Sequence, residues 1–297
     1  MRAGFVTILG RPNAGKSTLL NALVGTKLAI VAPKPQTTRT SIQGVLTLEG
    51  AQIAFIDTPG IHKSDTLLNR RMMDAVRTAA EGPDLVLFVI DALARPSQED
   101  THAVDLVRKT GAPAIAVLNK VDRLEDKPRL LKIIERYREM HDFVEFIPVS
   151  ARTRAGLDTL QREIVKRLPE GPALFPEDYL TDQPERFLAA EIIREKILRS
   201  ARQEVPHAVT VAIESWEETG QLTRITAIIY VEREGQKAIL IGSHGAALKK
   251  VGTEARTELE QLLDRKIFLQ TIVRVRKDWR EDPEFVAATD WRATLRM

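Results

Sequence analysis

The chain has 297 residues and no cysteine, which excludes disulfide bridges and thiolate metal sites. Its net charge is +3 and 43% of its residues are hydrophobic, a balance typical of a soluble globular protein with buried cores. No apolar run reaches the roughly 18 residues of a membrane-spanning helix, so such a helix is not expected. The short N-terminal apolar run leads into a glycine-rich loop and is interpreted as a strand, not as a signal peptide.

The first half of the chain alternates short apolar runs with segments of helical periodicity. We expect strands at 4–9, 43–49, 51–57, 84–91, 112–119 and 143–150, and helices at 16–25, 65–81, 97–110, 128–140 and 155–168. Apolar strands separated by helices indicate a mostly parallel sheet that is covered on both faces. Only Gly50 separates the second and third strands, so they should form an antiparallel hairpin at one edge.

A proline-rich stretch, 168–187, is predicted to lack regular structure. It divides the chain into a first domain (1–168), a linker (169–183) and a second domain (184–297). In the second domain we expect an αββααβ order, with elements at 184–203, 208–218, 222–233, 237–242, 245–264 and 266–277. The charged residues of EIIREKILRSARQE are interpreted as a solvated helix face. The last residues, 278–297, either pack on the second domain or remain loose.

The sequence GRPNAGKS, residues 10–17, matches G-x-x-x-x-G-K-[ST] between an expected strand and an expected helix. Glycines in this pattern let the backbone wrap a phosphate with its N–H groups pointing inward. Lys16 should reach the β- and γ-phosphates, and Ser17 should offer its hydroxyl to Mg²⁺. The predicted nucleotide-binding residues of this loop are Asn13, Ala14, Gly15, Lys16, Ser17 and Thr18.

The sequence NKVD, which ends another buried strand, predicts that the base is guanine. Asp122 can accept hydrogen bonds from both N1–H and the exocyclic amine of guanine, and adenine lacks these donors there. Asn119 can contact the other edge of the base and brace the phosphate loop, and the stem of Lys120 can lie along the base. Ser150 and Ala151 end the next strand, where the Ala151 N–H could meet guanine O6. GTP and GDP are therefore the predicted ligands.

Asp57 ends its strand in DTPG and is predicted to hold Mg²⁺ through water, while the Gly60 N–H is directed to the γ-phosphate. The polar loop APKPQTTRTS, 32–41, is expected to close on Mg²⁺ when the γ-phosphate is present. We favour Thr38 as the metal ligand, with Thr37 and Thr40 as alternatives. The groups predicted to act in catalysis are Lys16, Thr38 and Gly60.

Ile61 occupies the position where many GTPases carry a glutamine that orients the attacking water. An aliphatic side chain cannot hold a water molecule. Backbone groups of the two loops, a second water or a group from a partner must then do so, and His62 as a general base is an alternative.

The sequence IGSHGAALKK contains a GxxG loop, Gly242-Ser243-His244-Gly245, between two expected helices. In KH modules such a loop clamps a nucleic-acid backbone, and any side chain at the glycines would hold that backbone away. Lys249 and Lys250 on the following helix could reach phosphates. Arg274 and Arg276, at the end of the last strand, are also predicted to bind RNA. Residues 184–297 carry 19 Lys plus Arg and 18 Asp plus Glu, so RNA binding requires a local concentration of positive charge. A role other than RNA binding is the alternative.

Together the segments GRPNAGKSTLLNAL, PQTTR, DTPGIH, NKVD, VSA and AILIGSHGAALKKVGTEAR resemble the Era family of bacterial GTPases over nearly the whole chain. The resemblance implies an α/β P-loop GTPase domain with a mostly parallel sheet, followed by an α+β type II KH domain. It implies a GTP-hydrolysing switch that binds the 3′ end of small-subunit ribosomal RNA and assists maturation of the small ribosomal subunit. It also implies a cytoplasmic location with peripheral association with the inner membrane, and an Ile61 side chain that points away from the phosphates.

Related GTPases with asparagine at the position of Asn13 can hold K⁺ beside the phosphates, so Asn13 is a hypothetical K⁺ ligand, with bracing of the loop as the alternative role. The pair Ser243-His244 departs from the family, in which a basic residue is common in this loop. We expect slow turnover that RNA or the ribosome regulates. The alternatives are an RNA chaperone that hardly hydrolyses GTP and a membrane-associated cell-cycle regulator. Nothing in the sequence calls for an oligomer, so a monomer is expected.

Overall fold

The computed structural model describes the chain except for residues 35, 61–65, 127, 201–207 and 292–297. Contacts divide it into two compact units. The first comprises Met1–Ala29, Thr38–Ser64 and Asn69–Asp182, and the second comprises Ile30–Thr37, Asp65–Leu68 and Gln183–Met297. Within the described residues, no helix combines the length and the apolar character that crossing a membrane would require.

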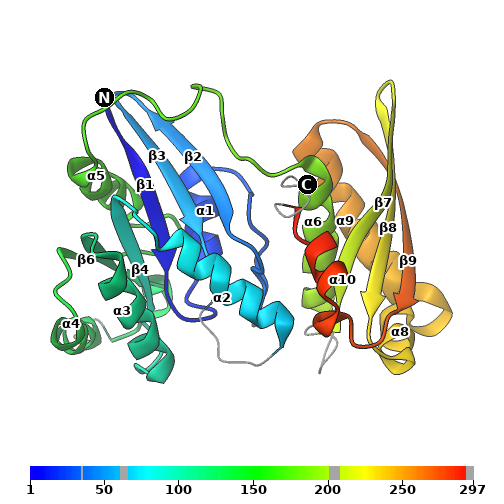
Figure 1. Cartoon of the computed structure of the whole chain (residues 1–297), viewed down its shortest axis with the longest axis horizontal. Coiled ribbons are helices and arrows are strands. Elements are labelled where there is room, and N and C mark those ends of the chain that lie inside the picture. Colours follow the sequence, from blue (N-terminus) through cyan, green and yellow to red (C-terminus); the bar gives the residue numbers. More distant parts are fainter. Residues whose placement is uncertain (35, 61–65, 127, 201–207, 292–297) are drawn as a thin grey trace. The chain divides into compact units, whose positions relative to one another are not determined.

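The first unit is built on a six-stranded sheet with the order β2-β3-β1-β4-β5-β6 (Figure 1). Its strands are β1 (Arg2–Leu9), β2 (Ile42–Leu48), β3 (Ala51–Asp57), β4 (Leu85–Asp91), β5 (Ala114–Asn119) and β6 (Glu145–Pro148). All neighbouring pairs are parallel except β2 and β3, which form an antiparallel hairpin at the edge. The predicted mostly parallel sheet is thereby confirmed, although β6 is shorter than expected.

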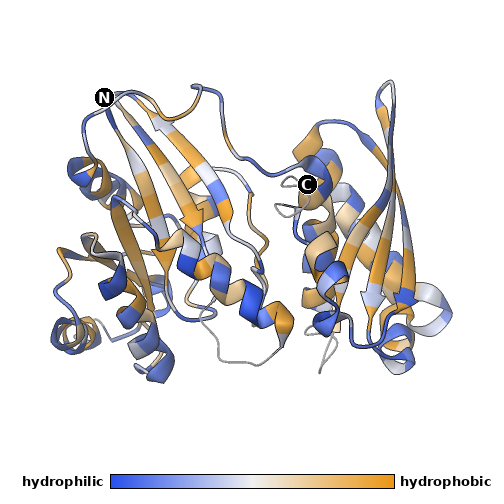
Figure 2. Cartoon of the chain, in the orientation of Figure 1, coloured by the Kyte–Doolittle hydropathy of each residue, from blue (hydrophilic) through white to orange (hydrophobic). Residues whose placement is uncertain are grey.

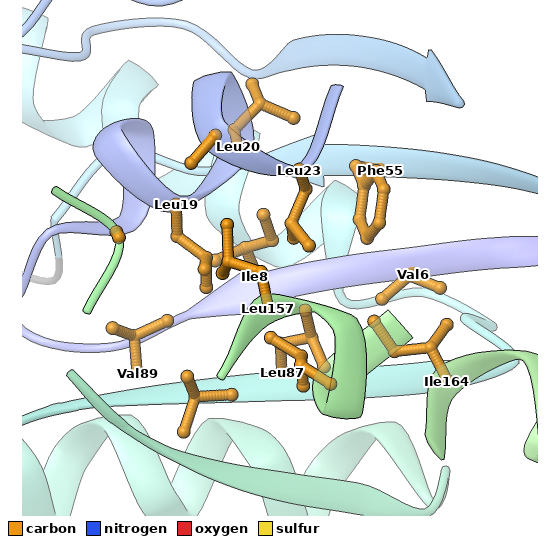
Figure 3. Close-up of a cluster of buried hydrophobic side chains, with 14 of the residues drawn as sticks. Val6, Ile8, Leu19, Leu20, Leu23, Phe55, Leu87, Val89, Leu157 and Ile164 are labelled. Carbon is orange, nitrogen blue, oxygen red and sulfur yellow. The ribbon is translucent and has the colours of Figure 1, made fainter. Parts of the chain in front are cut away.

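Helices cover both faces of this sheet: α1 (Lys16–Val24), α2 (Leu67–Ala79), α3 (Gln98–Thr110), α4 (Arg129–Met140) and α5 (Leu157–Arg167). Alternation along β4 explains why both faces are apolar, since odd-numbered Leu87 and Val89 face α1 and α5 (Figure 3). Even-numbered Phe88 and Ile90 pack against α3 and α4 on the other face. Each buried side chain of this size contributes about 1.5–3 kcal/mol. In Figure 2 the strands of this sheet are mostly hydrophobic, whereas the helices carry both hydrophilic and hydrophobic residues.

The linker predicted at 169–183 contains no helix or strand, but it is held against the first unit. Gln52 is fully buried, and its Oε1 accepts hydrogen bonds from the backbone N–H groups of Leu174 and Phe175 at 2.7 and 2.9 Å. The Val45 N–H donates to the Leu180 carbonyl at 2.8 Å. Hydrogen bonds to β2 and β3 thus hold this segment against the first unit.

The second unit has a three-stranded sheet of β7 (Thr210–Thr219), β8 (Leu222–Val231) and β9 (Lys266–Val275). β8 pairs with β7 antiparallel and with β9 parallel. The helices α6 (Glu185–Ser200), α8 (Glu234–Ile241) and α9 (Ala246–Leu263) supply the remaining elements of the predicted αββααβ order. The described part of the C-terminal segment packs on this unit, because Trp279 is fully buried and its Nε1 donates to the Ala208 carbonyl at 2.9 Å.

The prediction of a solvated charged face on α6 is wrong for Arg194 and Glu195, although Arg199 is exposed as expected. Arg194 and Glu195 are only 1% and 0% exposed. Residues 30–37 belong to the same unit and bond to both side chains. The Val31 N–H donates to Glu195 Oε1 at 2.8 Å, and Arg194 donates to the carbonyls of Gln36 and Thr37. Arg194 and Glu195 can be buried in this helix because backbone groups of residues 30–37 form hydrogen bonds with both charged side chains.

Candidate functional site

The loop between β1 and α1 is shaped to surround an anion. Lys16 is buried, and its Nζ donates to the carbonyls of Gly10 and Arg11, both at 3.0 Å. Gly15 has φ +99°, and a Cβ there would lie 2.3 Å from Asn119 Nδ2, so no side chain fits. The helix α1 begins directly after this glycine, so the positive end of its dipole lies at the loop. The loop residues Asn13, Ala14, Gly15, Lys16, Ser17 and Thr18 therefore bring backbone N–H groups and one cation to a single place.

Three oxygen-bearing side chains meet beside this loop. Ser17 Oγ donates to Asp57 Oδ2 at 2.6 Å and lies 2.8 Å from Thr38 Oγ1. Asp57 is fully buried, and its Oδ1 has no hydrogen-bond partner among the residues that the structure describes. Hydroxyl and carboxylate oxygens are the ligands that Mg²⁺ prefers, and an orphaned buried carboxylate oxygen needs such a partner. This donor set fits Mg²⁺.

The three threonines of the polar loop differ in position. Thr38 is 6% exposed and contributes to the oxygen cluster. Thr37 Oγ1 instead donates to the Lys34 carbonyl at 2.6 Å. Geometry therefore favours Thr38 over Thr37, and Thr40 is only half-buried.

Burial shifts both ionisable groups of the site toward their neutral forms. It raises the pKa of Asp57 to about 6, although Lys16 and the Ser17 hydroxyl oppose the shift. It lowers the pKa of Lys16 to about 8, an effect that the nearby Asp57 carboxylate only partly offsets. A divalent cation beside Asp57 and phosphate oxygens beside Lys16 would each restore the charged form.

The NKVD residues connect the phosphate loop to the strand ends beyond it. Asn119 Nδ2 donates to the Ala14 carbonyl at 3.0 Å, and Lys120 Nζ donates to the Asn13 carbonyl at 2.7 Å. Asn119 Oδ1 accepts from the Ala151 N–H at 3.1 Å, so this N–H is engaged by Asn119 in the structure.

The carboxylate that should read the base lies at the surface. Asp122 is exposed, and its Oδ1 accepts from Ser150 Oγ at 2.8 Å. This hydrogen bond fixes the orientation of a group that a ligand can reach from solvent. The structure thus brings Asn119, Lys120, Asp122, Ser150 and Ala151 together at one end of the sheet.

Gly60 lies against the phosphate loop, since a Cβ at this position would be 2.8 Å from Pro12 Cα. The preceding Thr58 donates to the Ile8 carbonyl at 2.8 Å and ties the end of β3 to β1. The residues on which the question of water activation depends, Ile61 and His62, lie outside the described residues.

In the second unit, the GxxG loop forms a tight turn between α8 and α9. Gly242 has φ +71°, and a Cβ there would lie 2.7 Å from the Ala247 Cβ. His244 is also left-handed, with φ 51°, and it is exposed together with Ser243. Gly245 ends the loop, and the exposed Lys249 and Lys250 follow in the first turns of α9.

Arg274 and Arg276 do not join this loop. Their neighbours Val273 and Val275 pack in the core under the helices, so alternation places both arginines on the opposite face of the sheet. There Arg274 pairs with Glu214 at 3.3 Å, and Arg276 pairs with Asp282 at 2.5 Å. Arg274 and Arg276 therefore lie on the face of the sheet away from the core under the helices, and their contact with RNA stays a prediction.

Sequence reasoning missed three charged residues that are linked to the phosphate loop and to Lys120 by ion pairs: Arg11, Asp91 and Asp100. Arg11 pairs with Asp91 at 3.8 Å and with Asp100 at 3.4 Å. Asp91 ends an apolar strand, as Asp57 does, and this shared position is the signal that could have identified it.

Family models match both halves of the chain. The model described as "50S ribosome-binding GTPase" matches residues 5–120, and the KH domain model matches residues 204–280. GTPase Era of Geobacter metallireducens is 50% identical over 283 residues, which cover 95% of each chain. GTPase Era of Stenotrophomonas maltophilia (strain K279a) is 48% identical and covers 94% of each chain.

Solved structures agree over nearly the full length. A single-residue variant of Aquifex aeolicus Era bound to GDP·AlF4⁻ has a TM-score of 0.94 and 40% identity, with 97% of this chain and 99% of that chain covered. Era in complex with MgGDPNP and nucleotides 1506–1542 of 16S ribosomal RNA also has a TM-score of 0.94 and 40% identity, with 97% and 98% covered.

Proposed function

We propose that this chain, which belongs to the Era family of GTPases, is a GTP-hydrolysing switch that binds the 3′ end of small-subunit ribosomal RNA and assists maturation of the small ribosomal subunit. The observation that carries the nucleotide part is the meeting of Ser17, Thr38 and Asp57 beside the phosphate loop. Two of these residues come from separate segments that follow the loop in sequence, so the cluster assembles only in the folded chain.

In this proposal Ser17, Thr38 and Asp57 would hold Mg²⁺, which neutralises charge that develops on the phosphates when it is bound. Lys16 holds the β- and γ-phosphates, and the Gly60 N–H donates to the γ-phosphate. Asp122 selects guanine, with Asn119 and Lys120 bracing the phosphate loop against the base site. Relatives of this family have been solved with GDP·AlF4⁻ and with MgGDPNP, which supports guanine nucleotide and Mg²⁺ as the ligands.

Slow, regulated turnover follows from the position after Gly60. The chain has Ile61 there, and the side chain at this position has no amide that could orient water. We infer that backbone groups of the loops, or a group from a bound partner, perform this task. Asn13 as a ligand for K⁺ would add positive charge beside the phosphates.

The RNA part of the proposal rests on the GxxG loop, its exposed Ser243 and His244, and the adjacent Lys249 and Lys250. A solved relative holds nucleotides 1506–1542 of 16S ribosomal RNA, which makes that segment the first ligand to test. We further propose a monomer in the cytoplasm with peripheral association with the inner membrane. Sedimentation with liposomes tests that association.

Binding of a short single-stranded RNA that copies this 3′ end tests the function directly. Gly242→Asp places a charged side chain where a Cβ would already meet Ala247, and it should weaken RNA binding by about tenfold or more while GDP binding remains. Gly235→Ala is the matched control, because a Cβ at Gly235 meets nothing within 4 Å. Equal RNA affinity of the wild-type chain and Gly242→Asp would contradict the proposed role of the loop.

A further inference from the structure

We propose that Asp91 is a positioning residue of the guanine site, which acts by holding the ammonium group of Lys120. Asp91 Oδ2 accepts a hydrogen bond from Lys120 Nζ at 2.7 Å, and the same Nζ donates to the Asn13 carbonyl at 2.7 Å. The Lys120 side chain therefore ends between a carboxylate and the phosphate loop. This fixes the course of its four-carbon stem, which in the proposed function lines the base site.

The Asp91 carboxylate is itself held rigidly. It ends β4 directly opposite Asn119 in the β4–β5 register. Its Oδ1 accepts from the Leu93 N–H at 3.0 Å, and the next residue, Ala92, donates its N–H to the Asn119 carbonyl at 3.0 Å. The side chain is only 13% exposed, so water competes weakly for the ion pair with Lys120.

The same carboxylate also faces the phosphate loop. Arg11, the second residue of the loop motif, lies 3.8 Å from Asp91 Oδ2. Its guanidinium is shared with Asp100, whose Oδ2 accepts from both the N–H and the hydroxyl of Ser97 at 2.9 Å. Asp91 thus lies between Arg11 of the phosphate loop and Lys120 of the NKVD sequence. Its interaction with Lys120 is the shorter of the two.

Loss of the Asp91 charge should release Lys120. Asp91→Asn keeps an oxygen for the Leu93 N–H but removes the charge that holds the ammonium. A flexible lysine would then have to be ordered again each time a nucleotide binds, which reduces affinity. Because a hydrogen bond between charged groups is lost, we expect GDP affinity to fall by about tenfold or more.

A double-mutant cycle on the full chain tests this role with GDP and GTP as probes. The four proteins are the wild type, Asp91→Asn, Lys120→Met and the double variant. Asp105→Asn is the control, because it also removes a carboxylate that pairs with an arginine, at 2.7 Å on the exposed side of α3. The loss caused by Asp91→Asn should appear in KM and the dissociation constant, and it should shrink to within about twofold in the Lys120→Met background.

Three results would overturn the role of Asp91. One is GDP affinity unchanged in Asp91→Asn. Another is an equal loss in the wild-type and Lys120→Met backgrounds, which would show that Asp91 does not act through Lys120. The third is a loss in Asp91→Asn that matches a loss of thermal stability without nucleotide. If Asp91→Asn does not fold, Asp91→Glu replaces it in the cycle, and equal losses in both backgrounds would again contradict the role. The inference rests on the proposed nucleotide site, so absence of GDP binding by the wild type would refute that site instead.

Discussion

Ser17 Oγ and Asp57 Oδ2 lie 2.6 Å apart although 40 residues separate them in the chain. Ser17 lies in the first turn of α1 and Asp57 ends β3, so the sheet brings the phosphate loop and the DTPG turn to the same end of its strands. The hydrogen bond from the Ser17 hydroxyl helps to stabilise the buried Asp57 carboxylate. The hydroxyl and carboxylate oxygens gathered here are the ligands that Mg²⁺ prefers.

Ser17→Ala should therefore reduce the dependence of GTP binding on Mg²⁺. We expect the ratio of GTP affinities in Mg²⁺ and in EDTA to fall by about tenfold, since one hydroxyl ligand is lost. Affinity in EDTA should change little. Ser200→Ala in α6 is the matched control, because its hydroxyl donates only to the Ile197 carbonyl at 3.2 Å in the described structure. An unchanged ratio in Ser17→Ala would exclude Ser17 from the metal site.

Affinity that depends on Mg²⁺ should also vary with pH. The pKa of Asp57 is raised to about 6 by burial, so below this pH the side chain is protonated and uncharged. The enhancement of GDP affinity by Mg²⁺ should then be greatest well above pH 6. It should decrease as the pH falls through 6, by at most about tenfold per pH unit for one proton. The phosphates of GDP also change ionisation with pH. Their effect on affinity should be the same in Asp57→Asn, so the pH profile of that variant is the baseline for the wild type. A pH profile identical in both proteins would contradict this assignment.

Base selectivity should move with Asp122. An aspartate accepts from N1–H and from the exocyclic amine of guanine, whereas an asparagine can donate to the carbonyl that xanthine carries in place of the amine. Asp122→Asn should therefore bind XDP more tightly than GDP, the reverse of the wild type. Competition of each nucleotide against a fluorescent analogue measures both affinities. A variant that still prefers GDP would place base recognition elsewhere.

Monovalent ions test the hypothesis for Asn13. This residue has φ +59°, and its carbonyl is already engaged by Lys120. If its side chain holds K⁺ beside the phosphates, turnover should be faster in K⁺ than in Na⁺, and Asn13→Ala should abolish that difference. Equal turnover of the wild type in the two salts would show that Asn13 only braces the loop.

Much of the fold follows from local patterns. β4 is a run of apolar residues without a polar interruption until Asp91, which is the pattern of a strand buried on both faces. The helix α1 begins after one glycine and ends at another, Gly25, with φ +86°. Contiguous motifs likewise identified the phosphate loop, because all of its groups lie within a few residues of one another.

Contacts between distant segments could not be predicted in this way. The ion pair joins Asp91 at the end of β4 to Lys120, which directly follows β5, and the side-chain periodicity of neither strand predicts it. Burial of Arg194 depends on carbonyls of residues 36 and 37, so the helix alone resembles a solvated one. Arg274 and Arg276 are different, since simple alternation with Val273 and Val275 could have assigned them to the other face.

In the proposed function, RNA held by the second domain controls GTP hydrolysis in the first. The most direct measurement is GTP turnover in K⁺ buffer, with and without the 3′-end RNA, for the wild type, Gly235→Ala and Gly242→Asp. RNA should accelerate turnover in the first two proteins and have no effect in Gly242→Asp. Turnover that stays flat although the wild type binds the RNA, or equal stimulation of Gly242→Asp, would contradict it.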